Sequence, residues 1–180
     1  MKIYVIRHGL TELNKQGRVN GQIDESLTSE GIEQAQALVL PLSISLIYTS
    51  PFLRTMQTVE IINAHLGLPI YPHDGLREIH MGSLAGKAWT EIEGGDKLKI
   101  AHRSVQFDYT SYGGESAEQA KKRVLGFLKQ IHGKHKDHEA LIVTHGGIIR
   151  VLHLLETGET TQEDIEHISP HTFDLNKILI

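Results

Sequence analysis

The sequence contains no cysteine among its 180 residues. This absence excludes disulfide-stapled scaffolds, cysteine-ligated zinc sites, thiol nucleophiles and cysteine-based phosphatase chemistry. It fits a reducing compartment, so we expect a cytoplasmic protein. A chain of this size buries about 70% of its unfolded surface, so it can form a core without a disulfide or metal staple.

Excess positive charge and a long apolar run are missing too. Lys and Arg number 18 against 22 Asp and Glu, which gives a net charge of −4 with neutral histidine. Because broad nucleic-acid binding needs clustered cations, we expect no nucleic-acid partner. The longest apolar stretch, residues 37–48, is interrupted by Pro41 and cannot span a bilayer. The apolar run over residues 1–6 is too short for a signal peptide, so we expect a globular protein with no membrane partner.

Histidine, in contrast, is abundant. The chain has 12 histidines, and protonating all of them would change the formal charge from −4 to +8. Because the ordinary histidine pKa lies near 6.5, we expect the behaviour of the protein to depend on pH near 6.

Short apolar strands alternate with helical patterns along the chain. Strands are expected over residues 2–6, 46–49, 68–71, 140–144 and, at an edge, 171–180. Helices are expected over residues 28–39, 50–67, 115–131 and 146–155, with short pieces near Trp89 and Lys97. In the second helix Ser50 would be the N-cap and Pro51 the first helical residue. This alternation predicts an α/β fold with a mainly parallel sheet, formed by a single domain over residues 1–180.

Two of the expected strands end in the same way. The first runs into Arg7-His8-Gly9, and the fourth runs into His145-Gly146-Gly147. Because ligands bind at the carboxyl ends of parallel strands, both histidines would face one crevice if these strands are neighbours. The glycines let backbone approach a ligand closely, and a glycine-rich helix start offers amide donors to an anion.

The segment from Arg7 to Asn14 resembles the R-H-G-x-T-x-x-N signature of the histidine phosphatase superfamily, the phosphoglycerate-mutase-like proteins. Further blocks follow in the family's order: Gly17-Arg18, Gly21, Asp24, Leu27-Thr28, Gly31, Gln34-Ala35, Ser50 to Thr58, Leu76 to Ile79, Gly82, Gly86, Gly113 to Ser116 and Thr144 to Gly147. The matches cover most of the chain. The resemblance implies a three-layer α/β/α sandwich with a mainly parallel central sheet, as in the phosphoglycerate-mutase-like fold.

The resemblance implies roles for five catalytic residues. His8 would be the nucleophile that attacks phosphorus and becomes phosphorylated. Arg7 and Arg54 would hold the phosphoryl oxygens, because planar guanidinium groups suit bidentate binding. His145 would stabilise charge during transfer. Glu78 would protonate the leaving oxygen and later take a proton from attacking water.

The resemblance also implies how the substrate is held. Asn14, Gly21 through its backbone, and Gly146 would complete the rim around the phosphate. These groups bind phosphate without a metal, and no other cofactor is expected. The expected partner is a small-molecule phosphate ester, and the oligomeric state stays open.

Two carboxylates have structural alternatives. Glu78 has Arg77 and His80 as neighbours, so a local ion pair competes with the acid role. Glu115-Ser116 is interpreted as a helix start, where a carboxylate favours the N-terminal dipole.

Other residues have more than one interpretation. His132, His135 and His138 recur at a spacing that suggests a metal site, but they lie in a polar, lysine-rich segment. A solvated surface run that binds added nickel or zinc adventitiously is the favoured interpretation. Trp89 either lines the substrate mouth or packs a short helix.

The chain also departs from the family pattern. Residues 80–86 replace the aromatic residue and G-x-W-E-G that several family phosphatases carry, Leu10 replaces Glu or Gln, and Ser26 replaces Pro. These changes alter the pocket wall without removing a catalytic group. The span from Glu78 to His145 is compact, which suits hydrolysis better than mutase chemistry.

We therefore interpret the chain as a histidine acid-type phosphatase that acts on a small phosphorylated metabolite, such as a sugar phosphate or α-ribazole phosphate. One alternative is a phosphoglycerate mutase, which would return the phosphoryl group to a second hydroxyl. The other is a non-catalytic phosphate-binding protein on the same fold.

Overall fold

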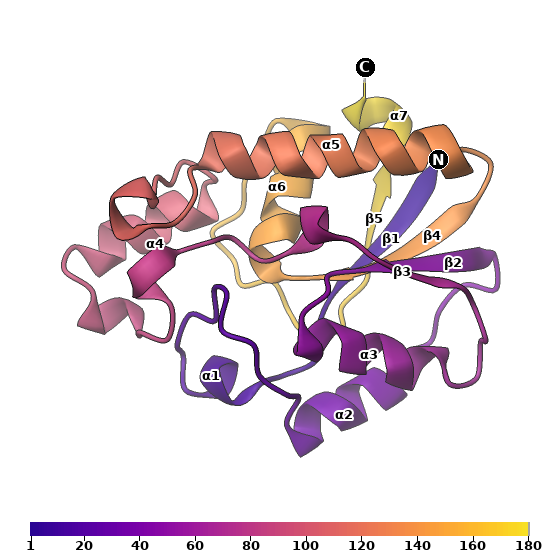
Figure 1. Cartoon of the computed structure of the whole chain (residues 1–180), viewed down its shortest axis with the longest axis horizontal. Helices are drawn as coiled ribbons and strands as arrows, with labels where there is room; N and C mark the ends of the chain where they lie inside the picture. The colour runs from indigo at the N-terminus through magenta and orange to yellow at the C-terminus, as the bar shows by residue number, and fades with distance from the viewer. Residues whose placement is uncertain (180) are drawn as a thin grey trace.

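The computed structural model describes residues 1–179 and is built around a five-stranded sheet (Figure 1). The strands are β1 (Lys2–Arg7), β2 (Ile44–Thr49), β3 (Ile70–Pro72), β4 (Glu139–Thr144) and β5 (His171–Asp174). Their order is β3-β2-β4-β1-β5, and only β5 is antiparallel to its neighbour. The predicted α/β class with a mainly parallel sheet is confirmed.

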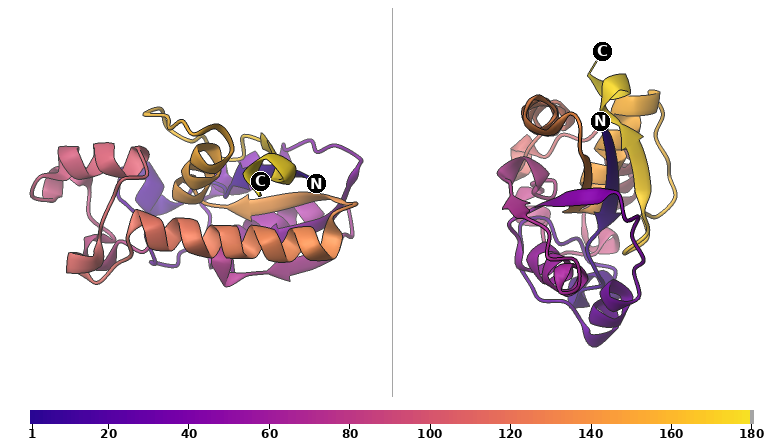
Figure 2. Two further views of the ribbon diagram at one scale, coloured as in Figure 1. Left: turned by 90° about the horizontal axis from the view of Figure 1, so that it is seen from above. Right: turned by 90° about the vertical axis from the view of Figure 1, so that its right-hand side faces the viewer.

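Helices cover both faces of this sheet. They are α1 (Glu12–Lys15), α2 (Ser29–Gln36), α3 (Leu53–Asn63), α4 (Gly95–Arg103), α5 (Ala117–His135), α6 (Gly146–Thr157) and α7 (Leu175–Ile178). Short 3₁₀ turns span residues 74–76, 82–84, 89–91 and 110–112. In the end view of Figure 2, α5 lies on one side of the strands, and α2 and α3 lie on the other. Within residues 1–179 no helix is long and apolar enough to cross a membrane.

The alternation of side chains along the strands explains the three layers. In β1, Ile3 and Val5 face a core that contains the apolar residues of α5, α6 and α7. Tyr4 and Ile6 face the other core, which α2 and α3 cover. Because both faces are buried, the central strands are apolar throughout, as is usual for parallel sheets.

One predicted helix start is wrong. Helix α3 begins at Leu53 with Phe52 as its N-cap, and not at Pro51. The Ser50 backbone N–H instead donates to Val143 O, which extends the ladder between β2 and β4, and Ser50 O accepts from Thr55 Oγ1. These tertiary bonds keep residues 50 and 51 in the turn.

Other boundaries differ by a few residues. Helix α3 ends at Asn63, before Gly67, because the Asn63 side chain bonds both backbone groups of Leu68 and closes the turn. Helix α2 ends before Val39, whose side chain is exposed. The edge strand stops at Asp174, whose carboxylate accepts from Asn176 N and caps α7. Position 180 of that expected strand lies outside the described residues.

Candidate active site

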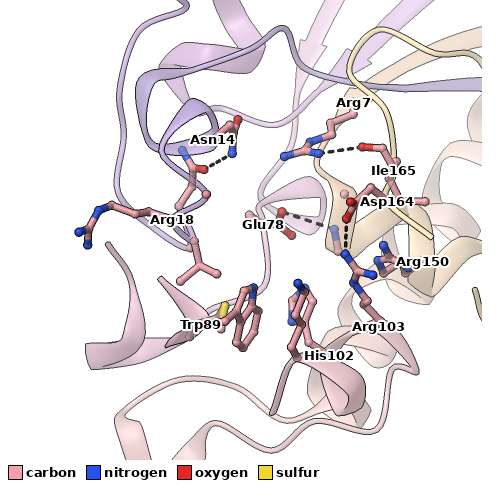
Figure 3. A pocket seen from close by; sticks show the side chains of 18 of the residues that line it. Arg7, Asn14, Arg18, Glu78, Trp89, His102, Arg103, Arg150, Asp164 and Ile165 are labelled. Atoms are coloured by element: carbon pink, nitrogen blue, oxygen red, sulfur yellow. Dashed lines mark hydrogen bonds and ion pairs between the residues drawn. The ribbon is translucent and has the colours of Figure 1, made fainter. Parts of the chain in front are cut away.

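Strands β1 and β4 are neighbours, so their carboxyl ends bring the two motif histidines together. Arg7 pairs with Thr144 in the parallel register, and the rings of His8 and His145 are 5.2 Å apart between centroids. A cavity of about 460 Å³ opens at this sheet edge (Figure 3). Six of the predicted site residues line it, namely Arg7, His8, Asn14, Gly21, Glu78 and Gly146. The two others, Arg54 and His145, are fully buried behind its wall.

The His8 side chain is held in one tautomer. Its Nδ1 lies 2.8 Å from the carbonyl oxygen of Gly9. A carbonyl can only accept, so Nδ1 carries the hydrogen and Nε2 keeps a free lone pair. Burial first, and then the charges of Arg7 and Arg54, lower the His8 pKa well below its ordinary value of 6.5. His8 is therefore neutral at physiological pH, which is the state a nucleophile requires.

Two arginines place unused donors near this imidazole. Arg7 Nη1 donates to Ile165 O at 2.7 Å, and Arg54 donates to the carbonyls of Ile23 and Gly21 at 2.7 and 3.1 Å. The Nε–H groups of both arginines are buried and have no protein partner within residues 1–179. An unsatisfied buried donor costs about 1–3 kcal/mol, so these positions favour an anion. A phosphoryl group supplies the missing acceptors.

The ring nitrogens of His145 are also buried without hydrogen-bond partners among the described residues. Its side chain has no exposed surface, and neither ring nitrogen has a hydrogen-bond partner within residues 1–179. Burial first, and then the positive charge of Arg54, lowers the His145 pKa well below 6.5. A neutral imidazole with a free N–H can donate to the same anion as the two arginines.

Glu78 does not form the local ion pair considered above. Arg77 Nε pairs with Asp74 at 2.6 Å instead. The Glu78 carboxylate lines the cavity, accepting from Ile79 N at 2.8 Å and lying 3.4 Å from Gly147 N. A side chain at Gly147 would collide with this carboxylate, so the glycine at the start of α6 leaves the space that Glu78 occupies.

The predicted rim residues are also part of internal networks. Asn14 accepts from Thr11 Oγ1 at 2.9 Å and donates to Asn20 Oδ1 at 2.5 Å, and Asn20 in turn donates to Glu25. Gly21 contributes its carbonyl to Arg54. Both residues line the cavity, and both also hold the loop after β1 in place.

The predicted helix start at Glu115-Ser116 is confirmed at Ser116, but Glu115 lies just before the helix and has another role. Ser116 is the N-cap of α5, while the Glu115 carboxylate accepts from His80 N and forms an ion pair with Arg123 at 2.7 Å. Arg123 also donates to the backbone carbonyl of Glu78 at 3.3 Å. The ion pair of Glu115 and Arg123 therefore anchors the segment that carries Glu78 to α5.

Sequence reasoning missed His167. Its Nδ1 lies 2.7 Å from the backbone oxygen of His8, its ring centroid lies 5.4 Å from that of His8, and it lines the cavity. It belongs to a loop that no motif marks. Trp89, left open above, lines the cavity as well.

The three histidines at metal-like spacing have separate partners. His132 Nε2 lies 3.2 Å from Asn176 Oδ1, and His138 Nδ1 lies 2.9 Å from Ser45 Oγ. His135 packs against aromatic rings of the sheet. Over the part of the chain described, no three His, Cys, Asp or Glu side chains are grouped so that they could hold a metal ion.

The buried histidines predict a loss of stability in acid. Burial lowers the pKa of His8 and His145 well below 6.5 and that of His167 to about 4, so they stay neutral in the fold while the unfolded chain binds protons. Stability should therefore fall as the pH drops from about 6.5 to about 4, by up to about 1.4 kcal/mol per pH unit for each group. Urea unfolding midpoints across this range measure it. A midpoint that stays constant down to about pH 4.5 would contradict the expectation.

The chain matches one protein family over nearly its whole length. The family model "Histidine phosphatase superfamily (branch 1)" matches residues 3–179. Phosphoglycerate mutase-like protein 4 of Arabidopsis thaliana is 34% identical over 162 residues, which cover 84% of this chain and 69% of that protein. The metal-independent phosphoserine phosphatase of the same plant is 33% identical, with coverages of 85% and 67%.

Solved structures show the same fold. Bacillus stearothermophilus YhfR has a TM-score of 0.84 at 28% identity, covering 96% of this chain and 90% of that one. A phosphoglycerate mutase from Thermus thermophilus has a TM-score of 0.79 at 30% identity, with coverages of 97% and 93%. The expected phosphoglycerate-mutase-like fold is confirmed.

Proposed function

We propose that this chain, which belongs to the histidine phosphatase superfamily, hydrolyses phosphate monoesters of small metabolites through a phosphohistidine on His8. One observation carries the proposal. The free Nε2 of a neutral His8 lies beside buried N–H groups of Arg7, Arg54 and His145 that have no partner among the described residues. This arrangement suits a phosphoryl group better than any neutral ligand.

The proposed reaction has two transfers. The Nε2 lone pair of His8 attacks phosphorus, the bond from phosphorus to the ester oxygen breaks, and Glu78 gives its proton to the departing alcohol. Arg7, Arg54 and His145 donate to the phosphoryl oxygens as their charge redistributes. Water then attacks the phosphohistidine, Glu78 takes a proton from it, and inorganic phosphate leaves. The chain's own groups bind the anion and move the protons, so we propose that no metal takes part.

The low His8 pKa supports the finer proposal of an acid-type phosphatase. Because His8 stays neutral well below pH 6.5, mild acid does not protonate the nucleophile. We therefore expect the rate to be kept as the pH falls moderately below neutrality.

Hydrolysis is preferred over the mutase alternative. One relative is named a phosphoserine phosphatase, and the segment between Glu78 and His145 contains only short turns, α4, α5 and the central strand β4. A mutase has to keep water away from its phosphohistidine until the second hydroxyl arrives.

Free phosphate release tests the proposal. The protein should release inorganic phosphate from a panel of small alkyl monoesters, retain this activity after exhaustive chelation, and be inhibited by vanadate, which resembles the five-coordinate transition state. The assay compares enzyme before and after chelation, with and without added divalent ions. Isomerised phosphoglycerate without free phosphate would favour the mutase, and activity restored only by a divalent ion would refute the metal-independent mechanism.

A further inference from the structure

Arginine side chains hold the segment that joins α6 to β5. Arg150 of α6 and Arg103 of α4 donate to the backbone carbonyl oxygens of residues 161–163. Arg7, at the end of β1, donates to the carbonyl oxygen of Ile165 at 2.7 Å (Figure 3). The backbone of this segment is therefore fixed from α4, from α6 and from the edge of the sheet that carries the proposed nucleophile.

The segment brings the His167 side chain onto the main chain of His8. His167 Nδ1 lies 2.7 Å from His8 O, and because a carbonyl only accepts, Nδ1 carries the hydrogen. Burial first, and then the positive charge of Arg7, lowers the His167 pKa to about 4, so the ring is neutral at physiological pH and its Nε2 has no hydrogen. A ring whose one N–H is bonded to His8 cannot also donate to a phosphoryl oxygen. His167 is therefore placed to act on the nucleophile and not to hold the phosphate.

The peptide group between His8 and Gly9 is held at both of its ends. Its oxygen accepts from His167, and its N–H, that of Gly9, donates to Thr58 Oγ1 at 3.1 Å. Thr58 Oγ1 in turn donates to Arg54 O at 2.7 Å. The His8 imidazole bonds the next carbonyl, Gly9 O, through Nδ1. The direction of His8 Nε2 therefore depends on how this peptide group is oriented.

A strained residue follows His167 directly. Ile168 has a φ of 56°, which is a genuine outlier for a β-branched side chain. Its N–H donates to Arg7 O at 3.0 Å, and its side chain is buried in the core that α2 and α3 cover. Such a conformation persists only where the surroundings impose it, and residues of this kind cluster at functional sites. The strain at Ile168 therefore marks the attachment of His167 to the end of β1 as a feature with a function.

We propose that His167 is a positioning residue for phosphoryl transfer: through its bond to His8 O, it holds the His8 imidazole in line for attack on phosphorus. The inference rests on the proposed function, in which His8 is the nucleophile, and adds a residue that no family motif marks. Reacting atoms have to meet at about 3–3.5 Å with aligned orbitals, and a misplacement of about 1 Å costs up to about 100-fold in rate. The donors of Arg54 and His145 do not depend on this bond, so its loss should lower kcat and leave phosphate affinity unchanged.

Leucine and asparagine at position 167 test the bond. The two side chains have nearly the same shape, but only asparagine has an N–H that can replace that of the imidazole. His167→Leu should lower kcat by about 10- to 100-fold, while the inhibition constant for inorganic phosphate changes less than about threefold. His167→Asn should restore kcat to within about fivefold of the wild type. Single-turnover reactions quenched in base should show that the leucine variant forms the phosphohistidine more slowly than the asparagine variant does.

Further variants make the test decisive. His167→Phe keeps a ring without the N–H and should show the same loss, which covers the case that His167→Leu unfolds. Glu163→Gln is the control within the same segment, because the Glu163 side chain is exposed and does not line the cavity, and it should keep the wild-type kcat.

Three results would overturn the positioning role. They are a wild-type kcat in the leucine and phenylalanine variants, a loss that asparagine does not restore, and a phosphate affinity that falls in parallel with kcat. Failure of the proposed function would show differently, because the wild type would then form no phosphohistidine at all.

Discussion

His8→Ala should reduce the turnover of phosphate monoesters by a factor on the order of 10⁴ or more. The proposed reaction passes through a bond between His8 Nε2 and phosphorus, and alanine has no lone pair to form it. The buried donors of Arg7, Arg54 and His145 remain in the variant. Substrate binding should therefore survive while turnover is lost. Steady-state phosphate release and calorimetric binding together measure this separation.

Trapping the intermediate completes this test. Acid-labile, base-stable phosphate should appear on His8 when wild-type turnover is quenched in base, and it should be absent from the variant. His65→Ala is a matched control, because His65 is exposed just after α3 and does not line the cavity. Its activity and melting temperature should stay close to those of the wild type. Robust turnover by the His8→Ala protein would refute the phosphohistidine mechanism.

Glu78→Gln should slow the hydrolysis of alkyl phosphates by roughly 10²- to 10⁴-fold, and should slow that of an aryl phosphate with a good leaving group far less. An alkoxide leaves only if it is protonated, whereas a nitrophenolate leaves largely unassisted. The glutamine keeps the shape of the side chain near Ile79 N and Gly147 N. The measurement is kcat/KM for both ester types in both proteins, with folding checked by thermal melting.

Glu166→Gln provides the control for this experiment. Glu166 lines the rim of the same cavity and is exposed, so its replacement removes a negative charge without removing the proposed acid. Its effect should be small and similar on both esters. If Glu78→Gln also produced equal, small losses on both esters, Glu78 would lose the acid role and another carboxylate of the cavity would have to supply the proton.

The sequence alone determined which strands lie at the centre of the sheet and which sheet edge carries the site. The apolar strands before Arg7-His8-Gly9 and His145-Gly146-Gly147 are buried on both faces, so their composition was a direct signal for central parallel strands. Parallel neighbours end at one edge, which brings His8 and His145 together. Helix boundaries were predicted less well where a tertiary bond competed with local capping. The backbone of Ser50 bonds to β4 and delays the start of α3.

Only the tertiary structure decided which groups position the predicted catalytic residues, and which buried N–H donors have no hydrogen-bond partner among the described residues. Glu115 and Arg123 hold the Glu78 loop, and His167 bonds the backbone of His8 from 159 residues away. The Nδ1 of His102, which lines the cavity, lies 3.1 Å from the buried hydroxyl of Tyr109. No local periodicity encodes these contacts, because each joins separate segments whose relative positions follow from the packing of the whole fold. Strand composition is a local property, whereas the direction of a hydrogen bond and the loss of water around a side chain exist only after folding.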